Sequence, residues 1–164
     1  MDRERLALAE SLGQCLQSRG LMLATAESCT GGWLAKTITD IAGSSQWFDC
    51  GFVTYSNQAK ERLLGVSADT LAAQGAVSEA TVREMVAGAL ARSRADWAVA
   101  ISGIAGPGGG TPDKPVGFVC FAWGPRHALI RSCGLYLEGD REGIRRQAVL
   151  FALRQLQEYV FESS

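Results

Sequence analysis

A short apolar segment, a hydroxyl-rich turn and two glycines lie between residues 21 and 38, and this junction constrains the fold more than any other feature. Leu21–Ala24 is an apolar run typical of a buried strand, and Trp33–Ile38 contains no proline to interrupt a helix. The residues between them, Thr25–Gly32, therefore join a strand directly to a helix. Strands that alternate with helices in this way are typical of layered α/β domains.

The same alternation continues along the chain. Helices are predicted from Leu6 to about Gly20 and at residues 57–64, 67–73, 78–90 and 141–161. Further strands are predicted at residues 48–55, 97–101, 116–123 and 128–137, the last two forming a hairpin that turns near Gly124–Pro125. Because a hairpin is antiparallel, the sheet should be mixed. We therefore predict a single α/β domain over residues 1–164, with three layers and a mixed β-sheet flanked by helices.

Composition excludes several functional classes. The chain has 16 basic and 17 acidic residues, so no strong field attracts it to nucleic acid or to an anionic membrane. No apolar run approaches the roughly 20 residues of a membrane span, and the charged Met1–Arg5 does not resemble a signal peptide. Five cysteines without a C-x-x-C pair favour reduced thiols, and a single histidine argues against a zinc site. We expect a cytoplasmic protein with no metal, no nucleic-acid partner and no membrane partner.

Ser28 is a candidate nucleophile at the strand-to-helix junction. Free backbone amides at a helix start favour negative charge, and Gly31 and Gly32 let a ligand approach the backbone closely. The amides of Thr30, Gly31 and Gly32 could then stabilise an oxyanion beside the serine. Two alternatives remain open: Ser28 could be an ordinary helix cap, and Cys29 could be either a competing nucleophile or a packing residue.

Lysine is the candidate base, because the only histidine, His127, falls near the tip of the predicted hairpin. Lys60 belongs to the first turns of the helix predicted after Tyr55. A helix N-terminus and partial burial would both lower the pKa of its ammonium group, as a base near neutral pH requires. The alternative for Lys60 is a solvated helix lysine. Tyr55 could hydrogen-bond Ser28 or Lys60, or it could only pack in its strand.

Two further segments could bind a ligand. The glycine-rich segment 102–110 follows a predicted strand, so amides around Ala105 and Gly106 could line a pocket at the end of the sheet. It matches neither common nucleotide-binding glycine pattern, and it could instead be a flexible connection. Arg141 opens the last predicted helix, where it could bind a phosphate or remain a surface residue.

Taken together, the motifs resemble those of the CinA C-terminal domain family, whose standalone members are nicotinamide-nucleotide amidohydrolases. The matching segments cover about residues 5–160 and occur in the family's order: Thr25–Gly32, Val53–Asn57 with Lys60, Leu64–Val66, Gly75–Ser78, Ser102–Pro107, Gly109–Gly110, Lys114–Gly117 and Gly139–Arg141. The chain resembles the standalone enzymes, because it shows no molybdopterin-binding-like domain before these motifs.

The resemblance implies hydrolysis of the carboxamide of nicotinamide mononucleotide to nicotinic acid mononucleotide and ammonia, a step of pyridine-nucleotide salvage. It implies Ser28 as nucleophile, Lys60 as general base and Tyr55 as an assisting residue, with no metal or organic cofactor and a homo-oligomeric assembly. The expected substrate-binding residues are Thr30, Gly31, Gly32, Ala105, Gly106 and Arg141. The alternative is a non-catalytic nucleotide-binding module that keeps the same fold and pocket without turnover.

Overall fold

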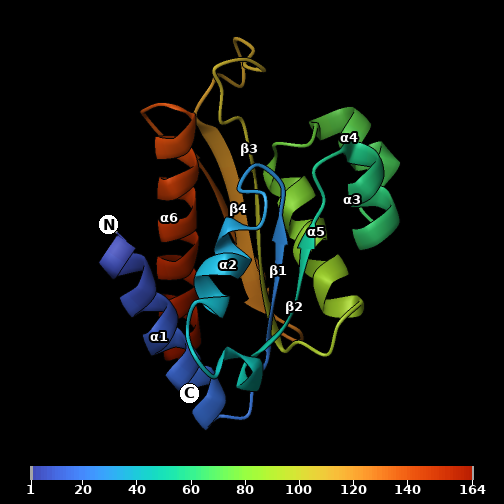
Figure 1. The fold of residues 1–164 in the computed structure, drawn as a ribbon. Helices are drawn as coiled ribbons and strands as arrows, with labels where there is room; N and C mark the ends of the chain where they lie inside the picture. Colours follow the sequence, from blue (N-terminus) through green and yellow to red (C-terminus); the bar gives the residue numbers. More distant parts are fainter. Residues whose placement is uncertain (1, 164) are drawn as a thin grey trace.

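Five strands form one sheet in the computed structural model, which describes residues 2–163 (Figure 1). The strands are β1 (Leu23–Glu27), β2 (Phe48–Val53), β3 (Trp97–Gly103), β4 (Phe118–Pro125) and β5 (Arg131–Tyr136). Their order across the sheet is β2-β1-β3-β4-β5. Strand β1 runs parallel to both of its neighbours, whereas β4 is antiparallel to β3 and β5. The sheet is therefore mixed, as the hairpin predicted.

Helices cover both faces of this sheet and complete the three layers (Figure 1). One face carries α1 (Asp2–Ser18), α2 (Trp33–Thr39) and α6 (Arg141–Glu162). The other carries α3 (Asn57–Leu64), α4 (Ala68–Gln74) and α5 (Glu79–Ala91), and a short 3-10 turn (Ser44–Gln46) precedes β2. The start signals in the sequence act as predicted, since the side chains of Ser56 and Ser78 accept backbone hydrogen bonds at the starts of α3 and α5. Within residues 2–163 no helix is both long and apolar enough to cross a membrane.

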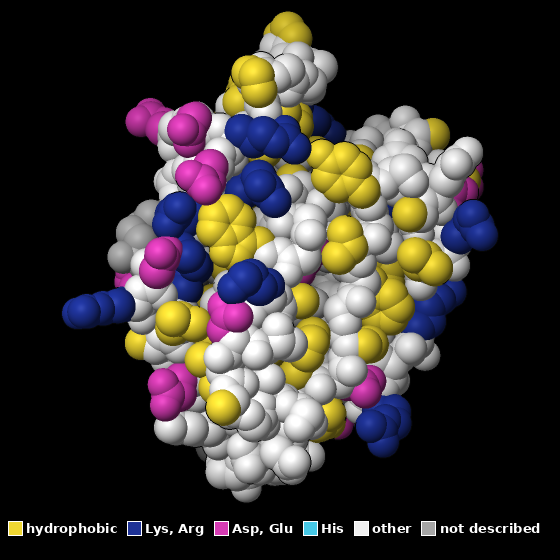
Figure 2. All heavy atoms as spheres, in the orientation of Figure 1, with side chains coloured by type: hydrophobic (Ala, Val, Ile, Leu, Met, Phe, Trp, Pro, Cys, Tyr) yellow, Lys and Arg dark blue, Asp and Glu magenta, His cyan; other side chains and the backbone are white. Residues whose placement is uncertain are grey.

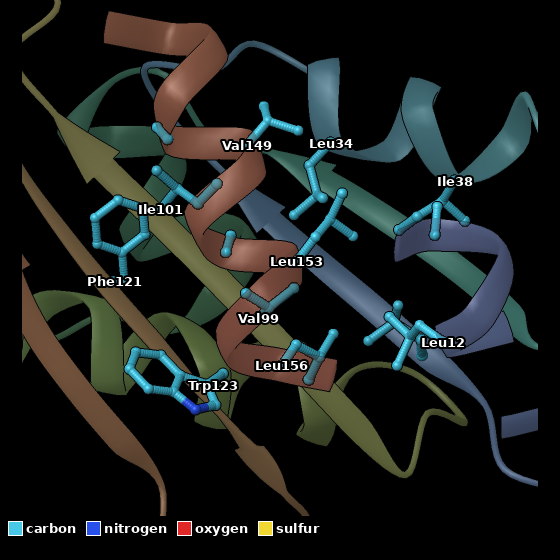
Figure 3. Close-up of a cluster of buried hydrophobic side chains, with 14 of the residues drawn as sticks. Leu12, Leu34, Ile38, Val99, Ile101, Phe121, Trp123, Val149, Leu153 and Leu156 are labelled. Carbon is cyan, nitrogen blue, oxygen red and sulfur yellow. The ribbon is translucent and has the colours of Figure 1, made fainter. Parts of the chain in front are cut away.

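Side chains of very different size cover the two faces of the sheet. Alternation along β3 sends Trp97, Val99 and Ile101 toward α1, α2 and α6, where they join large side chains from α6 and β4 (Figure 3). The residues between them, Ala98 and Ala100, point toward α5. We call the first side the large-residue face and the second the alanine face. Small residues let α5 lie close to the strands.

Most strand boundaries differ by a few residues from the sequence predictions: β2 ends at Val53 rather than at Tyr55, for example, and two of the shifts, in β1 and β4, affect the turns. Strand β1 begins at Leu23 and continues to Glu27, so it extends into the segment that was expected to be a turn. Its pairing with β2 on one side and β3 on the other holds these residues extended despite their polar side chains. Strand β4 continues through Pro125, so the hairpin turns after this residue rather than at Gly124–Pro125. Both strands end later than predicted and pair on two sides, an effect of tertiary pairing that local patterns do not contain.

Candidate active site

Ser28 stands at the carboxyl end of β1, between the ends of two neighbouring strands. Its amide donates to the carbonyl of Ile101 at 3.0 Å, and the amide of Thr54 donates to the carbonyl of Glu27 at 2.9 Å. These bonds hold the chain extended as far as Ser28. The strand alternation then directs Glu27 to the large-residue face and Ser28 to the alanine face. The serine side chain therefore projects toward the helices that follow β2.

Lys60 meets Ser28 from the first turn of α3. Its Nζ lies 2.9 Å from Ser28 Oγ, 2.8 Å from the carbonyl oxygen of Thr54 and 3.4 Å from that of Tyr55. The lysine is 1% exposed, and no carboxylate among residues 2–163 pairs with it. Burial therefore lowers the pKa of the ammonium group from 10.5 to about 8.

These contacts suit a neutral amine as well as an ammonium ion. A neutral Lys60 has two N–H groups for the carbonyls of Thr54 and Tyr55, which leaves its lone pair free to accept the hydroxyl proton of Ser28. The structure brings together the two residues that the sequence indicated as nucleophile and base, and their catalytic roles stay a prediction.

Tyr55 takes part in the site differently from the sequence expectation. Its side chain is 62% exposed, and its hydroxyl oxygen accepts from Arg141 Nη2 at 3.1 Å. The hydroxyl makes no hydrogen bond to Ser28 or Lys60; only the Tyr55 carbonyl reaches the lysine. Arg141 Nη1 also donates to the carbonyl of Gly106 at 2.7 Å. Arg141 therefore links Tyr55 to the glycine-rich segment, which projects beyond the sheet near the start of α6 (Figure 1).

Glu27 organises the turn after β1, a role that the sequence patterns did not indicate. This buried carboxylate accepts from Thr30 Oγ1 at 2.6 Å and from the amides of Leu34 and Ala35 at 2.9 and 3.1 Å. A protein side chain thus caps α2, and the expectation of free helix-start amides is wrong for Leu34 and Ala35. The available signal was an acidic residue at the end of an otherwise uncharged strand.

Two hollows lie on either side of the turn formed by residues 28–32. The smaller has a volume of about 210 Å³ and is lined by Ser28, Cys29, Tyr55, Lys60, Ala76, Val77, Ser102, Gly103, Ala105 and Arg141. The larger, of about 580 Å³, is lined by Asp2, Arg5, Leu6, Thr30, Gly31, Gly32, Trp33, Lys36, Thr37, Asp40 and Arg145. The candidate substrate-binding residues are thus divided: Ala105 and Arg141 share the hollow of Ser28 and Lys60, whereas Thr30, Gly31 and Gly32 border the other. Gly106 lines neither hollow, and it is connected to the smaller one only through Arg141, which donates to its carbonyl.

Cys29 is a packing residue by its surroundings. Its side chain is 6% exposed and belongs to the core of the large-residue face, opposite to Ser28. Burial raises the pKa of the thiol to about 11, so the reactive thiolate is scarce at neutral pH. Of the two neighbouring residues that the sequence offered as nucleophile, the structure therefore favours Ser28.

A model of the CinA C-terminal domain matches residues 5–160. The chain belongs to this family. It is 56% identical over 158 residues to the nicotinamide-nucleotide amidohydrolase PncC of Escherichia coli K12, a match that covers 94% of each chain. It is 53% identical to a putative competence-damage inducible protein of Symbiobacterium thermophilum, over 93% of this chain and 38% of that longer protein.

Solved structures of family members have the same fold. The crystal structure of the competence/damage inducible protein CihA from Agrobacterium tumefaciens superposes with a TM-score of 0.91, at 47% identity and 93% coverage of both chains. A CinA superfamily protein from Klebsiella pneumoniae superposes with a TM-score of 0.92 at 44% identity, over 96% of this chain and 98% of that one. The predicted fold class is confirmed by these structures as well as by the sheet described above.

Proposed function

We propose that this CinA family member hydrolyses the carboxamide of nicotinamide mononucleotide to nicotinic acid mononucleotide and ammonia. The observation that carries the proposal is the 2.9 Å contact between Ser28 Oγ and a buried Lys60 that has no carboxylate partner among the described residues. A lysine that only stabilises a fold is normally exposed or paired with an acid. The 56% identity to a nicotinamide-nucleotide amidohydrolase supports the choice of substrate.

Acylation of the serine begins with neutral Lys60. As Ser28 Oγ attacks the carboxamide carbon, the Oγ–H proton passes to Lys60 Nζ, and the carbonyl oxygen becomes an oxyanion. Collapse of this tetrahedral intermediate breaks the C–N bond. Lys60 returns the proton to the departing nitrogen, so that ammonia leaves and a nicotinoyl ester of Ser28 remains.

Deacylation repeats the same proton transfers with water. Lys60 takes a proton from a water molecule as its oxygen attacks the ester carbon. The C–Oγ bond then breaks, Lys60 protonates Ser28 Oγ, and the carboxylic acid product leaves. The sum of both halves is amide plus water giving acid plus ammonia, and Ser28 and Lys60 return to their starting states.

Arg141 is the candidate for holding the nucleotide end of the substrate. Its guanidinium lies on the rim of the smaller hollow and is anchored by Tyr55 Oη and the Gly106 carbonyl. A planar guanidinium suits a phosphate, and its two anchors reduce the side-chain entropy that binding would cost. Tyr55 then assists by orienting Arg141 rather than by direct contact with Ser28.

The alternative, a non-catalytic nucleotide-binding module, makes a different prediction. Ammonia release from nicotinamide mononucleotide separates the two, because a binding module would bind the nucleotide without turnover. For an amidohydrolase, Ser28→Ala should abolish ammonia release while the melting temperature and nucleotide binding are kept. The matched Cys29→Ala variant should stay active, because its thiol is buried and protonated. Full activity in Ser28→Ala would refute the assignment of the nucleophile.

A further inference from the structure

Arg145 of α6 contacts the turn of residues 28–32 from the large-residue face, although 116 positions separate it from Cys29 in the sequence. Its Nε donates to the carbonyl of Cys29 at 3.0 Å, and its Nη2 donates to the carbonyl of Thr30 at 3.2 Å. It lines the larger hollow, on the side of the turn away from Ser28 and Lys60. Figure 2 shows basic side chains gathered where α1, α2 and α6 meet, and Arg145 belongs to this group with its guanidinium 5.5 Å from the Trp33 ring.

A hydrogen bond that fixes the carbonyl of one residue also fixes the amide of the next residue, because both belong to one planar peptide unit. In a trans peptide the C=O and N–H groups point in opposite directions. The Cys29 carbonyl points toward Arg145, so the Thr30 amide in the same peptide unit points away from Arg145 and from the larger hollow. In the preceding unit the Ser28 carbonyl is held by the Gly31 amide at 3.0 Å, which directs the Cys29 amide away from Gly31.

Three amides of the turn donate to no other group among residues 2–163: those of Cys29, Thr30 and Gly32. The amides of Gly31, Trp33, Leu34 and Ala35 are all engaged, so Gly31 is not the free oxyanion donor that the sequence suggested. Gly32 borders the larger hollow, which leaves the Cys29 and Thr30 amides as the candidates beside Ser28. Buried backbone amides are rarely left without a partner, so a pair of them beside a nucleophile suits an oxyanion.

We infer that Arg145 is a positioning residue, which orients the Thr30 amide as an oxyanion donor by holding the Cys29 carbonyl of the same peptide unit, while its second bond, to the Thr30 carbonyl, fixes the guanidinium in place. The inference rests on the proposed function, because it concerns the oxyanion of that reaction. Arg145 then contributes to the transition state without touching the substrate. Binding of the ground-state amide depends little on it, since the full negative charge develops only after Ser28 attacks.

The neighbouring arginine supplies a matched control. Arg146 also lies 5.5 Å from the Trp33 ring, but it pairs with Asp2 and makes no hydrogen bond to the turn. We would compare Arg145→Lys with Arg146→Lys, since lysine keeps the charge but cannot reproduce a two-point bond from Nε and Nη2. We expect kcat for nicotinamide mononucleotide to fall at least about tenfold in Arg145→Lys, with a nearly unchanged KM, and to stay at the wild-type value in Arg146→Lys.

A second substrate separates positioning from phosphate binding and from misfolding. p-Nitrophenyl acetate has no phosphate. When Ser28 Oγ attacks its ester carbon, an oxyanion forms at the position that the amide oxyanion would occupy. The amplitude of its pre-steady-state burst counts competent sites, and the burst rate measures acylation. We expect Arg145→Lys to slow the burst by a factor similar to its loss in kcat. A raised KM with a normal burst would overturn the inference in favour of direct substrate binding, and a reduced amplitude at the normal rate would overturn it in favour of a purely structural role.

The burst also separates this inference from the proposed function. If the wild-type protein acylates with the ester but releases no ammonia from the nucleotide, the amidase proposal fails. The burst rate of Arg145→Lys still decides the role of Arg145 in that case.

Discussion

The two faces of the sheet make different contributions to the candidate site. The large-residue face supplies rigid anchors for the turn after β1: Glu27 caps α2 from within the strand, and Arg145 holds two carbonyls from α6. The alanine face supplies the reacting groups, Ser28 and Lys60, in a small hollow between β1 and α3. One face therefore fixes the backbone while the other hosts the chemistry. Because the turn spans both, damage to either face should reach the site by a different route.

Replacing the base should give the largest effect and test the alanine face directly. Lys60→Met keeps the length of the side chain but removes the proton acceptor, so kcat/KM should fall by about 10⁴-fold or more. The same variant should be more stable than the wild type at pH 7, by on the order of 1–3 kcal/mol, because a buried ammonium without a carboxylate partner is removed. Kinetics and thermal melts on one preparation measure both.

The gain in stability should depend on pH with a definite sign. The pKa of Lys60 is about 8 in the folded protein, against an ordinary value of 10.5 for an exposed lysine in the unfolded chain. As the pH rises, the folded protein therefore loses this proton at a lower pH than the unfolded chain does. The cost of burying the charge is fully present below pH 8 and is relieved as the pH rises from 8 toward 10.5. The stability advantage of Lys60→Met should therefore shrink over that interval. A constant or growing advantage would show that Lys60 is not buried as an ammonium.

A cavity on the large-residue face should cost stability before it costs chemistry. Leu153 is fully buried among the large side chains of α6, β3 and α2 (Figure 3). Leu153→Ala should destabilise the protein by about 3 kcal/mol through lost burial and an unfilled cavity. Urea unfolding measures this loss. Well below its melting temperature the variant should keep KM and most of kcat. A selective loss of kcat would mean that the cavity displaces Glu27 or Arg145, which hold the turn after β1.

The alanine face should respond to added volume instead. Gly88 of α5 lies against α3, where an added Cβ would collide with the carbonyl oxygen of Leu64. Gly88→Ala should cost about 1–3 kcal/mol despite the better helix propensity of alanine, because backbone cannot move aside as a flexible side chain can. It should also lower kcat, since α3 carries Lys60. Gly108→Ala is the matched control: an added Cβ there meets nothing within 4 Å, so Tm should not change.

Local sequence patterns predicted most elements because their signals are local. Ser56 and Ser78 start helices, and Gly65 ends α3 in a left-handed conformation that glycine tolerates. The large-small alternation from Trp97 to Ile101 also stands in the sequence, although we interpreted that segment only as a buried strand. The residue types suggested Ser28 and Lys60 separately as nucleophile and base, but local patterns do not show that they meet, because 32 positions separate them; the family resemblance supported the pairing.

The anchors of the turn were beyond local reasoning. Arg145 binds the Cys29 carbonyl across 116 residues, and nothing near either position indicates the contact. Glu27 caps a helix that begins six residues after it, at a distance where a loop residue is the usual cap. For Tyr55 the location was predicted but the contact was not. Its place beside the site was predicted, but its hydroxyl is held by Arg141, 86 residues away.

The smallest effect we expect is a shift in the pH profile, and it tests whether the base on the alanine face acts as a free amine. With a pKa of about 8, roughly a tenth of Lys60 is neutral at pH 7, so kcat/KM should rise about tenfold toward pH 9 and then level off. Val77 lines the same small hollow and provides a handle on this value. Val77→Asp places a carboxylate near Lys60, which favours the ammonium form and should move the midpoint upward by about one unit. Val77→Asn has nearly the same shape without the charge, so its midpoint should stay near pH 8. Equal midpoints in the two variants would assign the titration to a group other than Lys60, and would contradict the role of Lys60 as the general base on the alanine face.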